Sequence, residues 1–313
     1  MAKLFSLTPC RRLAIVLLLM LVALRPACLL AEGPPLRILC STFPIYQITR
    51  NVTKGRAAAQ VSLMLPAQFG CPHDYTLTPK DMQRLAQTDV LVINGLGMES
   101  FMGAKTTVVN PRAKVIDSSQ GITDTLRYQP GEDEDDPHNQ GINPHLFTSP
   151  RLAGLLAANI AAGLTAVDPS GREIYHKNAN DYQARMMDLE RQAVLVGQAL
   201  ANRRIITEHG VFDYLARDMG LKVVGVIEAH PGQAPSASEM LALIKTAKTA
   251  KAGAIFSEPQ YPAQVAKTIA REAGIPYAVL DPAVSGPDSA GLDYYEVVMR
   301  CNLQILKGTL GGK

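Results

Sequence analysis

Short apolar runs bounded by turn residues recur along the chain and predict the strands of its sheets. Helical patterns separate these runs. Apolar strands that alternate with helices are typical of parallel sheets covered by helices, so the pattern predicts an α/β fold. The predicted strands are Arg37–Cys40, Val61–Leu65, Val90–Ile93, Arg204–Thr207, Val223–Ile227, Ala254–Phe256 and Tyr277–Leu280.

Two predicted helices begin at clear capping signals. Thr78 offers a hydroxyl N-cap, Pro79 takes the first helical position and Asp81 stands at the third. Ser149 and Pro150 repeat this arrangement. Apolar residues then recur at helical spacing in both segments. They are Met82, Leu85 and Ala86 in the first helix and Leu152, Leu155, Leu156, Ile160 and Leu164 in the second.

The segment Ser170–Leu200 lacks proline and is rich in helix-forming residues. It predicts one helix of about 30 residues and about 45 Å. Strand–helix units lie on both sides, which favours a stiff connector between two halves; a long helix packed inside one domain is the alternative. The predicted organisation is an N-terminal α/β lobe at 36–168, a connecting helix at 169–201 and a C-terminal α/β lobe at 202–313.

Residues 1–31 have the pattern of an export signal. Lys3, Arg11 and Arg12 give a positive start, and Leu13–Leu24 is an apolar run too short for a comfortable membrane span. Cleavage after Ala31 predicts a mature periplasmic protein. An uncleaved N-terminal anchor is the alternative.

Removal of this signal changes the charge balance. Four of the 31 basic residues lie in it, so the mature chain carries 27 basic against 28 acidic residues. A nearly neutral chain lacks the electrostatic motive for binding nucleic acid. Aromatic residues make up 5% of the chain and Trp is absent, which disfavours a site built on base or sugar stacking.

Three cysteines remain in the mature chain: Cys40, Cys71 and Cys301. In an oxidising compartment one disulfide and one free thiol is the natural count, and we expect Cys40 to pair with Cys71. Cys28 lies within the export segment. A lipid-anchored form through its thiol is less favoured, because Arg25 stands where a lipid-attachment motif requires an apolar residue.

The run from Glu132 to His138 packs five acidic residues beside a histidine. Adjacent like charges repel one another, which favours a solvated surface loop. A weak, exposed metal-collecting loop is the alternative, because carboxylates and imidazole both suit divalent ions.

Three histidines and one aspartate fall at the carboxyl ends of predicted strands or just before predicted helices. His73 precedes the first capped helix and His145 precedes the second, whereas His209 and Asp281 directly follow strands. Ligands of open α/β sheets bind at the carboxyl ends of the strands. The four residues are widely and evenly spaced, so they predict a site in the cleft between the lobes, with two ligands from each.

The chemistry of this set indicates a class of cargo. Three neutral imidazoles and one carboxylate suit Zn²⁺, with Mn²⁺ and Fe²⁺ next, and are too rich in nitrogen for Ca²⁺ or Mg²⁺. The sequence contains no Cys-x-x-Cys and no His-Glu-x-x-His, so neither a zinc finger nor a zincin is supported.

Several motifs in order resemble those of the zinc- and manganese-binding solute receptors of ABC importers. The resemblance covers about residues 36–308. The motifs are Gly70–Asp81 around His73, Ala86–Glu99, Asn143–Pro150 around His145, Glu208–Tyr214 around His209, Pro235–Ser236, Phe256–Gln260 and Leu280–Pro282 around Asp281.

The resemblance implies that His73, His145, His209 and Asp281 bind the metal. It also implies two lobes joined by a rigid helix, and a monomer that is not an enzyme and hands its metal to a membrane permease. The sequence departs from the family in its short acidic run, where many zinc-binding members have a His-rich loop, and in Cys71 beside the first ligand. His209 favours zinc, since members with Glu there lean towards manganese.

Two other functions remain open. Three histidines and a water would suit an exported zinc-dependent hydrolase, with Glu208 or Glu258 as the base. Asp281 as a fourth ligand would fill the open position and argues against it. A metal-independent surface adhesin on the same scaffold is the other alternative.

Overall fold

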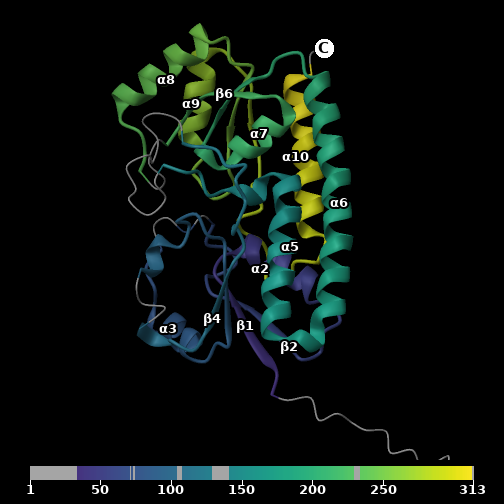
Figure 1. Ribbon diagram of the computed structural model, residues 1–313. Coiled ribbons are helices and arrows are strands. Elements are labelled where there is room, and N and C mark those ends of the chain that lie inside the picture. The colour runs from purple at the N-terminus through teal and green to yellow at the C-terminus, as the bar shows by residue number, and fades with distance from the viewer. Residues whose placement is uncertain are drawn as a thin grey trace, which may run out of the picture. The chain divides into compact units, whose positions relative to one another are not determined.

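The protein is built around two parallel four-stranded sheets (Figure 1). The computed structural model describes residues 34–70, 72, 75–103, 108–128, 141–228 and 233–311. The chain divides into a segment Met1–Pro35 and a larger unit Leu36–Lys313, and all that follows concerns the larger unit.

Both sheets have the same strand order. The first runs β2-β1-β3-β4 and the second β6-β5-β7-β8, all parallel. The order reverses beside β1 and beside β5, which places a crevice at the carboxyl ends of the central strands in each sheet. The strands are β1 Leu36–Cys40, β2 Ala59–Leu63, β3 Val90–Ile93, β4 Lys114–Asp117, β5 Arg204–Thr207, β6 Lys222–Val226, β7 Ala254–Ser257 and β8 Tyr277–Val279.

All seven predicted strands are present within two residues of their predicted ends, and the two-sheet α/β class is confirmed. The sequence did not predict β4. It lies at the edge of its sheet, where Lys114 is exposed and Val115 is 51% exposed. A half-exposed edge strand lacks the continuous apolar run that marked the others.

The helices cover the sheets on both faces. Thr78 caps α3 with a full capping box, and the Ser149 hydroxyl accepts from the Leu152 backbone at the start of α5, as the sequence predicts. The helices are α2 Phe43–Val52, α3 Pro79–Ala86, α5 Pro150–Val167, α6 Arg172–Ala199, α7 Asp213–Met219, α8 Ala237–Thr249, α9 Gln264–Ala273 and α10 Tyr294–Leu310.

The predicted long helix is α6, which has 28 residues and is therefore about 42 Å long. It runs beside both sheets (Figure 1). One stripe of α6 is buried against its neighbours, at a spacing of three or four residues. Near its end Gly197 allows a close approach, because a Cβ there would lie 2.0 Å from the Met219 carbonyl oxygen of α7.

One apolar core joins the two sheets. Each sheet turns one face to this core, whose remaining members come mainly from α5, α6 and α10. Successive strand residues point to opposite faces, so alternate residues fill separate outer clusters under α3, α8 and α9. The shared core includes Ile38, Val92, Ile205 and Phe256, and the outer clusters include Leu39, Leu91, Ile206 and Ile255.

Helix α5 is long and apolar enough to cross a membrane, by composition alone and among the described residues. Half of it is buried inside the protein. It packs along α6 within the shared core, which explains its apolar composition.

The expected disulfide is wrong: Cys40 is a free thiol, fully buried in the shared core. Cys40 lies two residues beyond Ile38 on β1 and therefore points to the same face. Burial raises the pKa of the thiol to about 12, so it stays protonated. Cys301 is also free and is exposed on α10, and Cys71 lies outside the described residues.

A second long element, α10, runs beside α6 (Figure 1). The segment before α10 reaches α2 of the first sheet, where Arg50 and Asn51 donate to the carbonyl oxygens of Ala290 and Leu292, both at 2.8 Å. The far end of α10 returns to the second sheet, where the Leu310 carbonyl accepts from the Ala201 backbone at 3.0 Å. The two sheets are therefore bridged by more than one helix.

Arg185 links three helices through its guanidinium group. From α6 its Nε lies 2.7 Å from Glu296 Oε1 on α10, and its Nη2 donates to Asn51 Oδ1 on α2 at 2.7 Å. Glu296 is 2% exposed, so its carboxylate depends on this guanidinium for compensation.

We predict that Arg185→Ala lowers the free energy of unfolding by about 1–3 kcal/mol, because it leaves a buried carboxylate without its cation. Urea unfolding at neutral pH measures the change. The double variant Arg185→Ala/Glu296→Gln should recover part of the loss, since a neutral amide is cheaper to bury. Equal stability of the single variant and the wild type would contradict the stabilising role of Arg185.

Candidate metal site

His145 lies in the loop that leads into α5. The ring is fully buried, and its Nδ1 lies 2.8 Å from Asn143 Oδ1. The His145 backbone N–H also donates to Asn143 Oδ1, at 3.0 Å. An amide oxygen can only accept, so Nδ1 carries the hydrogen and the lone pair is left on Nε2.

The carboxyl ends of β1 and β3 support this loop. The Glu99 carboxylate accepts from the Ser41 hydroxyl at 2.6 Å and from the Asn94 backbone at 2.7 Å, and Asn94 Nδ2 donates to the Pro144 carbonyl at 2.9 Å. Burial raises the pKa of Glu99 to about 7. Gly95 has a φ of +87°, and a Cβ there would lie 2.1 Å from Asp117 Oδ1, so glycine is required.

His209 lies just beyond β5, in the second sheet. It is 1% exposed, and its Nδ1 lies 2.8 Å from Oε1 of Glu258, which directly follows β7. A carboxylate beside a histidine helps to orient the ring where that histidine binds a metal. From the sequence, we considered Glu258 only as the base of a hydrolase. Its position directly after a central strand could have indicated that it lies beside His209.

The two histidines meet although they come from different sheets. Their ring centroids are 5.3 Å apart and the ring planes make an angle of 74°. A metal-bound imidazole has its centroid about 3.2 Å from the ion, so two rings on one tetrahedral zinc lie about 5.2 Å apart. Aromatic rings of Tyr128, Phe147 and Tyr261 surround the pair.

Asp281 lies beyond β8 and is anchored to α10. Its backbone N–H donates to Asn302 Oδ1 at 3.0 Å, and its carbonyl accepts from Asn302 Nδ2 at 2.6 Å. Its Oδ1 accepts from the Ala283 backbone at 2.8 Å. Burial raises the pKa of the Asp281 carboxyl.

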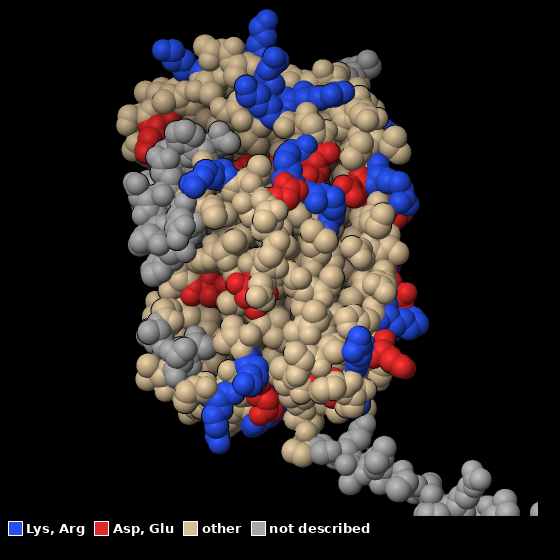
Figure 2. Space-filling model, in the orientation of Figure 1, with Lys and Arg blue, Asp and Glu red and all other residues tan. Residues whose placement is uncertain are grey.

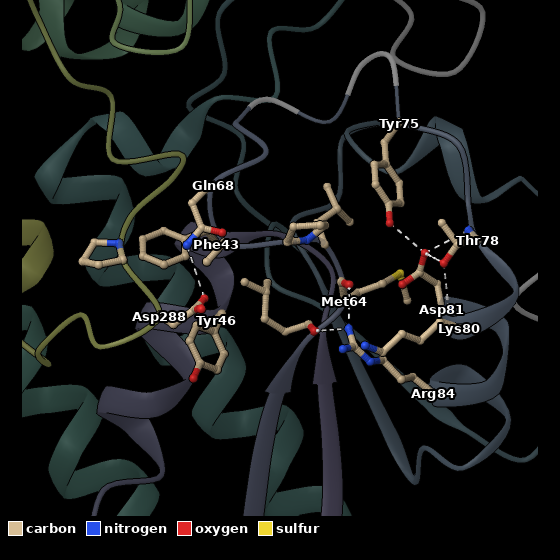
Figure 3. A pocket seen from close by; sticks show the side chains of 15 residues that line it. Phe43, Tyr46, Met64, Gln68, Tyr75, Thr78, Lys80, Asp81, Arg84 and Asp288 are labelled. Atoms are coloured by element: carbon tan, nitrogen blue, oxygen red, sulfur yellow. Dashed lines mark hydrogen bonds between the residues drawn. The ribbon is translucent and has the colours of Figure 1, made fainter.

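His73 lies outside the described residues, but the segment that follows it is well anchored. Asp81 Oδ2 accepts from the Tyr75 hydroxyl at 2.7 Å and from the Thr78 backbone at 2.9 Å (Figure 3). Burial works to raise the pKa of Asp81, but the donors from Thr78 and Tyr75 outweigh it, and the pKa lies below its usual value.

These residues line a pocket of about 530 Å³ at the carboxyl end of β2 (Figure 3). Arg84 closes one side, where its Nη1 donates to the carbonyl oxygens of Leu63 and Met64 at 3.1 and 3.0 Å. None of the predicted ligands that the structure describes lines this pocket.

The structure therefore brings His145 and His209 together and places Asp281 at the carboxyl end of a strand in the second sheet. Within the described residues, no three His, Cys, Asp or Glu side chains form a group that could hold a metal ion. Among the described residues, the histidine pair is therefore the candidate for metal binding.

Hydrogen bonds hold the loops of the two histidines together. Asn143 Nδ2 donates to the Gly210 carbonyl at 2.6 Å, and the Thr148 hydroxyl donates to the Val211 carbonyl at 2.9 Å. The Tyr214 hydroxyl of α7 donates to the Asn143 carbonyl at 2.6 Å. These contacts are buried, so the histidine pair is fixed from both sides.

Ion pairs continue this connection at the surface. Arg217 of α7 lies 2.9 Å from Asp124, which also pairs with Arg151 of α5. Figure 2 shows basic and acidic side chains gathered together in this region. Exposed pairs of this kind contribute little stability individually, so the buried hydrogen bonds carry the connection.

Three acidic residues lie beyond neighbouring strands of the second sheet, as His209 does. Glu208, Glu228 and Glu258 are all buried and lie beyond β5, β6 and β7. Burial, together with the charges of Glu258 and Glu228, raises the pKa of Glu208 to about 8. A nearby cation would offset the negative charge that these carboxyl groups develop when they ionise.

Glu208 should make the metal-free protein less stable as the pH rises. Its pKa is about 8 in the folded state against 4.5 for the ordinary group, so the folded state holds an extra proton between these values. We predict that Glu208→Gln stabilises the metal-free protein by about 1 kcal/mol or more at pH 8 relative to its effect at pH 5. Thermal unfolding with a chelator measures this. An equal effect at both pH values would contradict the buried charge.

Two parallel sheets of identical strand order, a shared core and candidate ligands at the carboxyl ends of their strands define a two-lobed α/β solute-binding protein. A family model described as "zinc-uptake complex component A periplasmic" matches residues 38–309. The chain belongs to this family.

Individual proteins of known identity are similar to this chain over most of its length. The high-affinity zinc uptake system protein ZnuA of Bacillus subtilis is 30% identical over 290 residues, which cover 90% of this chain and 89% of that protein. The zinc-binding lipoprotein AdcA of Streptococcus pneumoniae is 29% identical, but the match covers 56% of its length. FpvC of Pseudomonas aeruginosa, solved with Mn²⁺, is 28% identical with a TM-score of 0.75, covering 88% of this chain and 98% of FpvC.

Proposed function

We propose that this protein captures a divalent transition metal, Zn²⁺ before Mn²⁺ or Fe²⁺, and delivers it to the membrane permease of an ABC importer. One observation supports the proposal most directly: the buried rings of His145 and His209 come from different sheets, and their centroids are 5.3 Å apart. Nδ1 of each ring lies 2.8 Å from an oxygen, Asn143 Oδ1 for His145 and Glu258 Oε1 for His209. Two imidazoles that are held in this way present their Nε2 lone pairs as ligands. His73 and Asp281 complete the set.

The class of cargo follows from the donor set and from the relatives. Imidazole nitrogen with one carboxylate suits borderline metals such as zinc. The Bacillus subtilis relative is named for zinc uptake, and FpvC was solved with Mn²⁺.

The remaining properties follow from this role. Residues 1–31 act as a cleaved export signal, and the mature protein works in the periplasm as a monomer. It consists of an N-terminal lobe at 36–168, a connecting helix at 169–201 and a C-terminal lobe at 202–313. The family is one of transport components, and Glu258, which contacts His209 Nδ1, is placed to orient the imidazole rather than to activate water.

Metal exchange is expected to move loops rather than whole lobes. A wide hinge would have to open the core shared by α5, α6 and α10 and break the bonds between the histidine loops. Loops at the carboxyl ends of the strands can rearrange locally without opening this core.

Replacement of His145 tests the site. We predict that the mature wild type binds one zinc per chain and that His145→Ala weakens binding by more than about a hundredfold, since it removes a ligand rather than a supporting residue. Elemental analysis and competitive titration measure this. His176→Ala, at an exposed position on α6, is the matched control and should bind like the wild type.

Absence of stoichiometric metal from the wild type would reject the proposal. Manganese or iron at the same stoichiometry would keep the role and change the cargo. Binding that is unchanged in His145→Ala would remove that residue from the site.

Acid should weaken the binding. Ligand histidines must lose their protons to bind metal, so zinc affinity should fall as the pH drops through about 6.5. Asp281 acts in the same direction, because its raised pKa lets a proton compete at higher pH than at an ordinary aspartate. Competitive titrations across this range measure the effect, and a constant affinity would contradict histidine ligation.

A further inference from the structure

Asn143 is a fully buried side chain that uses both ends of its amide. Oδ1 accepts from the His145 backbone at 3.0 Å and lies 2.8 Å from His145 Nδ1. Nδ2 donates to the Gly210 carbonyl at 2.6 Å and to Asp213 Oδ2 at 3.1 Å. One amide therefore contacts the loops of both histidines.

The chemistry of its neighbours decides which way the amide points. If the amide were turned over, its NH₂ group would face the His145 backbone N–H, and its oxygen would face a carbonyl and a carboxylate. Two donors or two acceptors in contact are repulsive in a buried site. The orientation with Oδ1 towards His145 is therefore the one that satisfies every partner.

This orientation has a consequence for the imidazole. Oδ1 offers no hydrogen, so His145 must place its own hydrogen on Nδ1, and Nε2 keeps its lone pair before any metal arrives. The opposite end of the amide holds the residue that directly follows His209. Asn143 thus sets both the tautomer of His145 and the position of its loop against that of His209.

We propose that Asn143 is a positioning residue that holds His145 and His209 as a preformed pair, so that the metal meets two ligands that are already in place. The effect on cargo rests on the function proposed above; the effect on the tautomer does not. Other supports are more local: Glu258 contacts His209, and Asn302 holds the backbone of Asp281.

The bonds from Tyr214 and Thr148 between the two loops do not involve the Asn143 side chain. They remain when that side chain is shortened, which favours a folded variant. Asn143→Ala removes both halves of the bridge. Asn143→Asp keeps an acceptor for His145 but loses the donor to Gly210 and faces the carboxylate of Asp213.

Asn110 offers a matched control. It is also a buried asparagine, and its Nδ2 donates to the carbonyl oxygens of Leu85 and Thr88 at 2.9 and 2.8 Å, at the end of α3. Asn110→Ala should lower stability without changing the histidines.

The first experiment reads the histidine tautomers by ¹⁵N NMR of the metal-free mature protein at about pH 8, where imidazoles are neutral. His145→Gln identifies the His145 signal. We expect hydrogen on Nδ1 in the wild type, Asn143→Asp and Asn110→Ala, and a mixture of tautomers in Asn143→Ala. Hydrogen on Nε2 of His145 in the wild type would overturn the proposal.

The second experiment measures zinc affinity by competition. We expect Asn143→Ala to bind about 10–100-fold more weakly than the wild type, as for other residues that orient metal ligands. Asn143→Asp should also bind more weakly, although its tautomer is correct, and Asn110→Ala should bind normally. Wild-type affinity in Asn143→Ala would overturn the proposal. If that variant does not fold, wild-type affinity in Asn143→Asp would show that the link from Asn143 to the His209 loop does not matter for binding, which would overturn the proposal.

A wild type that binds no zinc would reject the proposed function. The tautomer measurement would then still decide whether Asn143 positions His145.

Discussion

The two sheets share one apolar core, and the other features of the protein follow from this constraint. Helices α5, α6 and α10 each bury a face in it, and both sheets turn a face towards it. Exposing about 400 Å² of such surface would cost about 10 kcal/mol, which is comparable to the whole stability of many domains. The two sheets are therefore held as one scaffold, and the loops at the ends of their strands carry the candidate ligands.

Those loops are held by buried polar groups, and the two described histidines are supported by different chemistry. His145 faces a neutral amide at Asn143, whereas His209 faces a carboxylate at Glu258. The two imidazoles therefore lie in different electrostatic surroundings, one beside a neutral amide and the other beside a carboxyl group. A cation bound nearby would offset the charge of the buried carboxyl groups around His209, whose ionisation burial otherwise disfavours. A protein that binds a metal ion gains from such a site, whereas one that binds an anion would not.

Much of the fold could be read from the sequence, because strands buried on both faces produce continuous apolar runs and capped helices begin at recognisable residues. Two failures show the limit. The edge strand β4 has an exposed face, so Lys114 and Val115 broke the pattern. The predicted pairing of Cys40 was wrong because the number of cysteines says nothing about where each side chain points. Cys40 lies on β1, and the alternation of strand residues directs its thiol into the core on the same face as Ile38. Composition reports burial well, but it does not report which neighbour a buried side chain meets.

The sequence by itself determined the α/β class, the long helix and the placing of His145, His209 and Asp281 at the ends of secondary-structure elements, since these depend on local periodicity and on the polarity of parallel strands. Only the tertiary structure decided that two histidines from different sheets meet, that Asn143 bridges their loops and that Glu258 and Asn302 support His209 and Asp281. Such contacts join residues that lie far apart in the chain. They are set by how the sheets and helices pack, which no local pattern records.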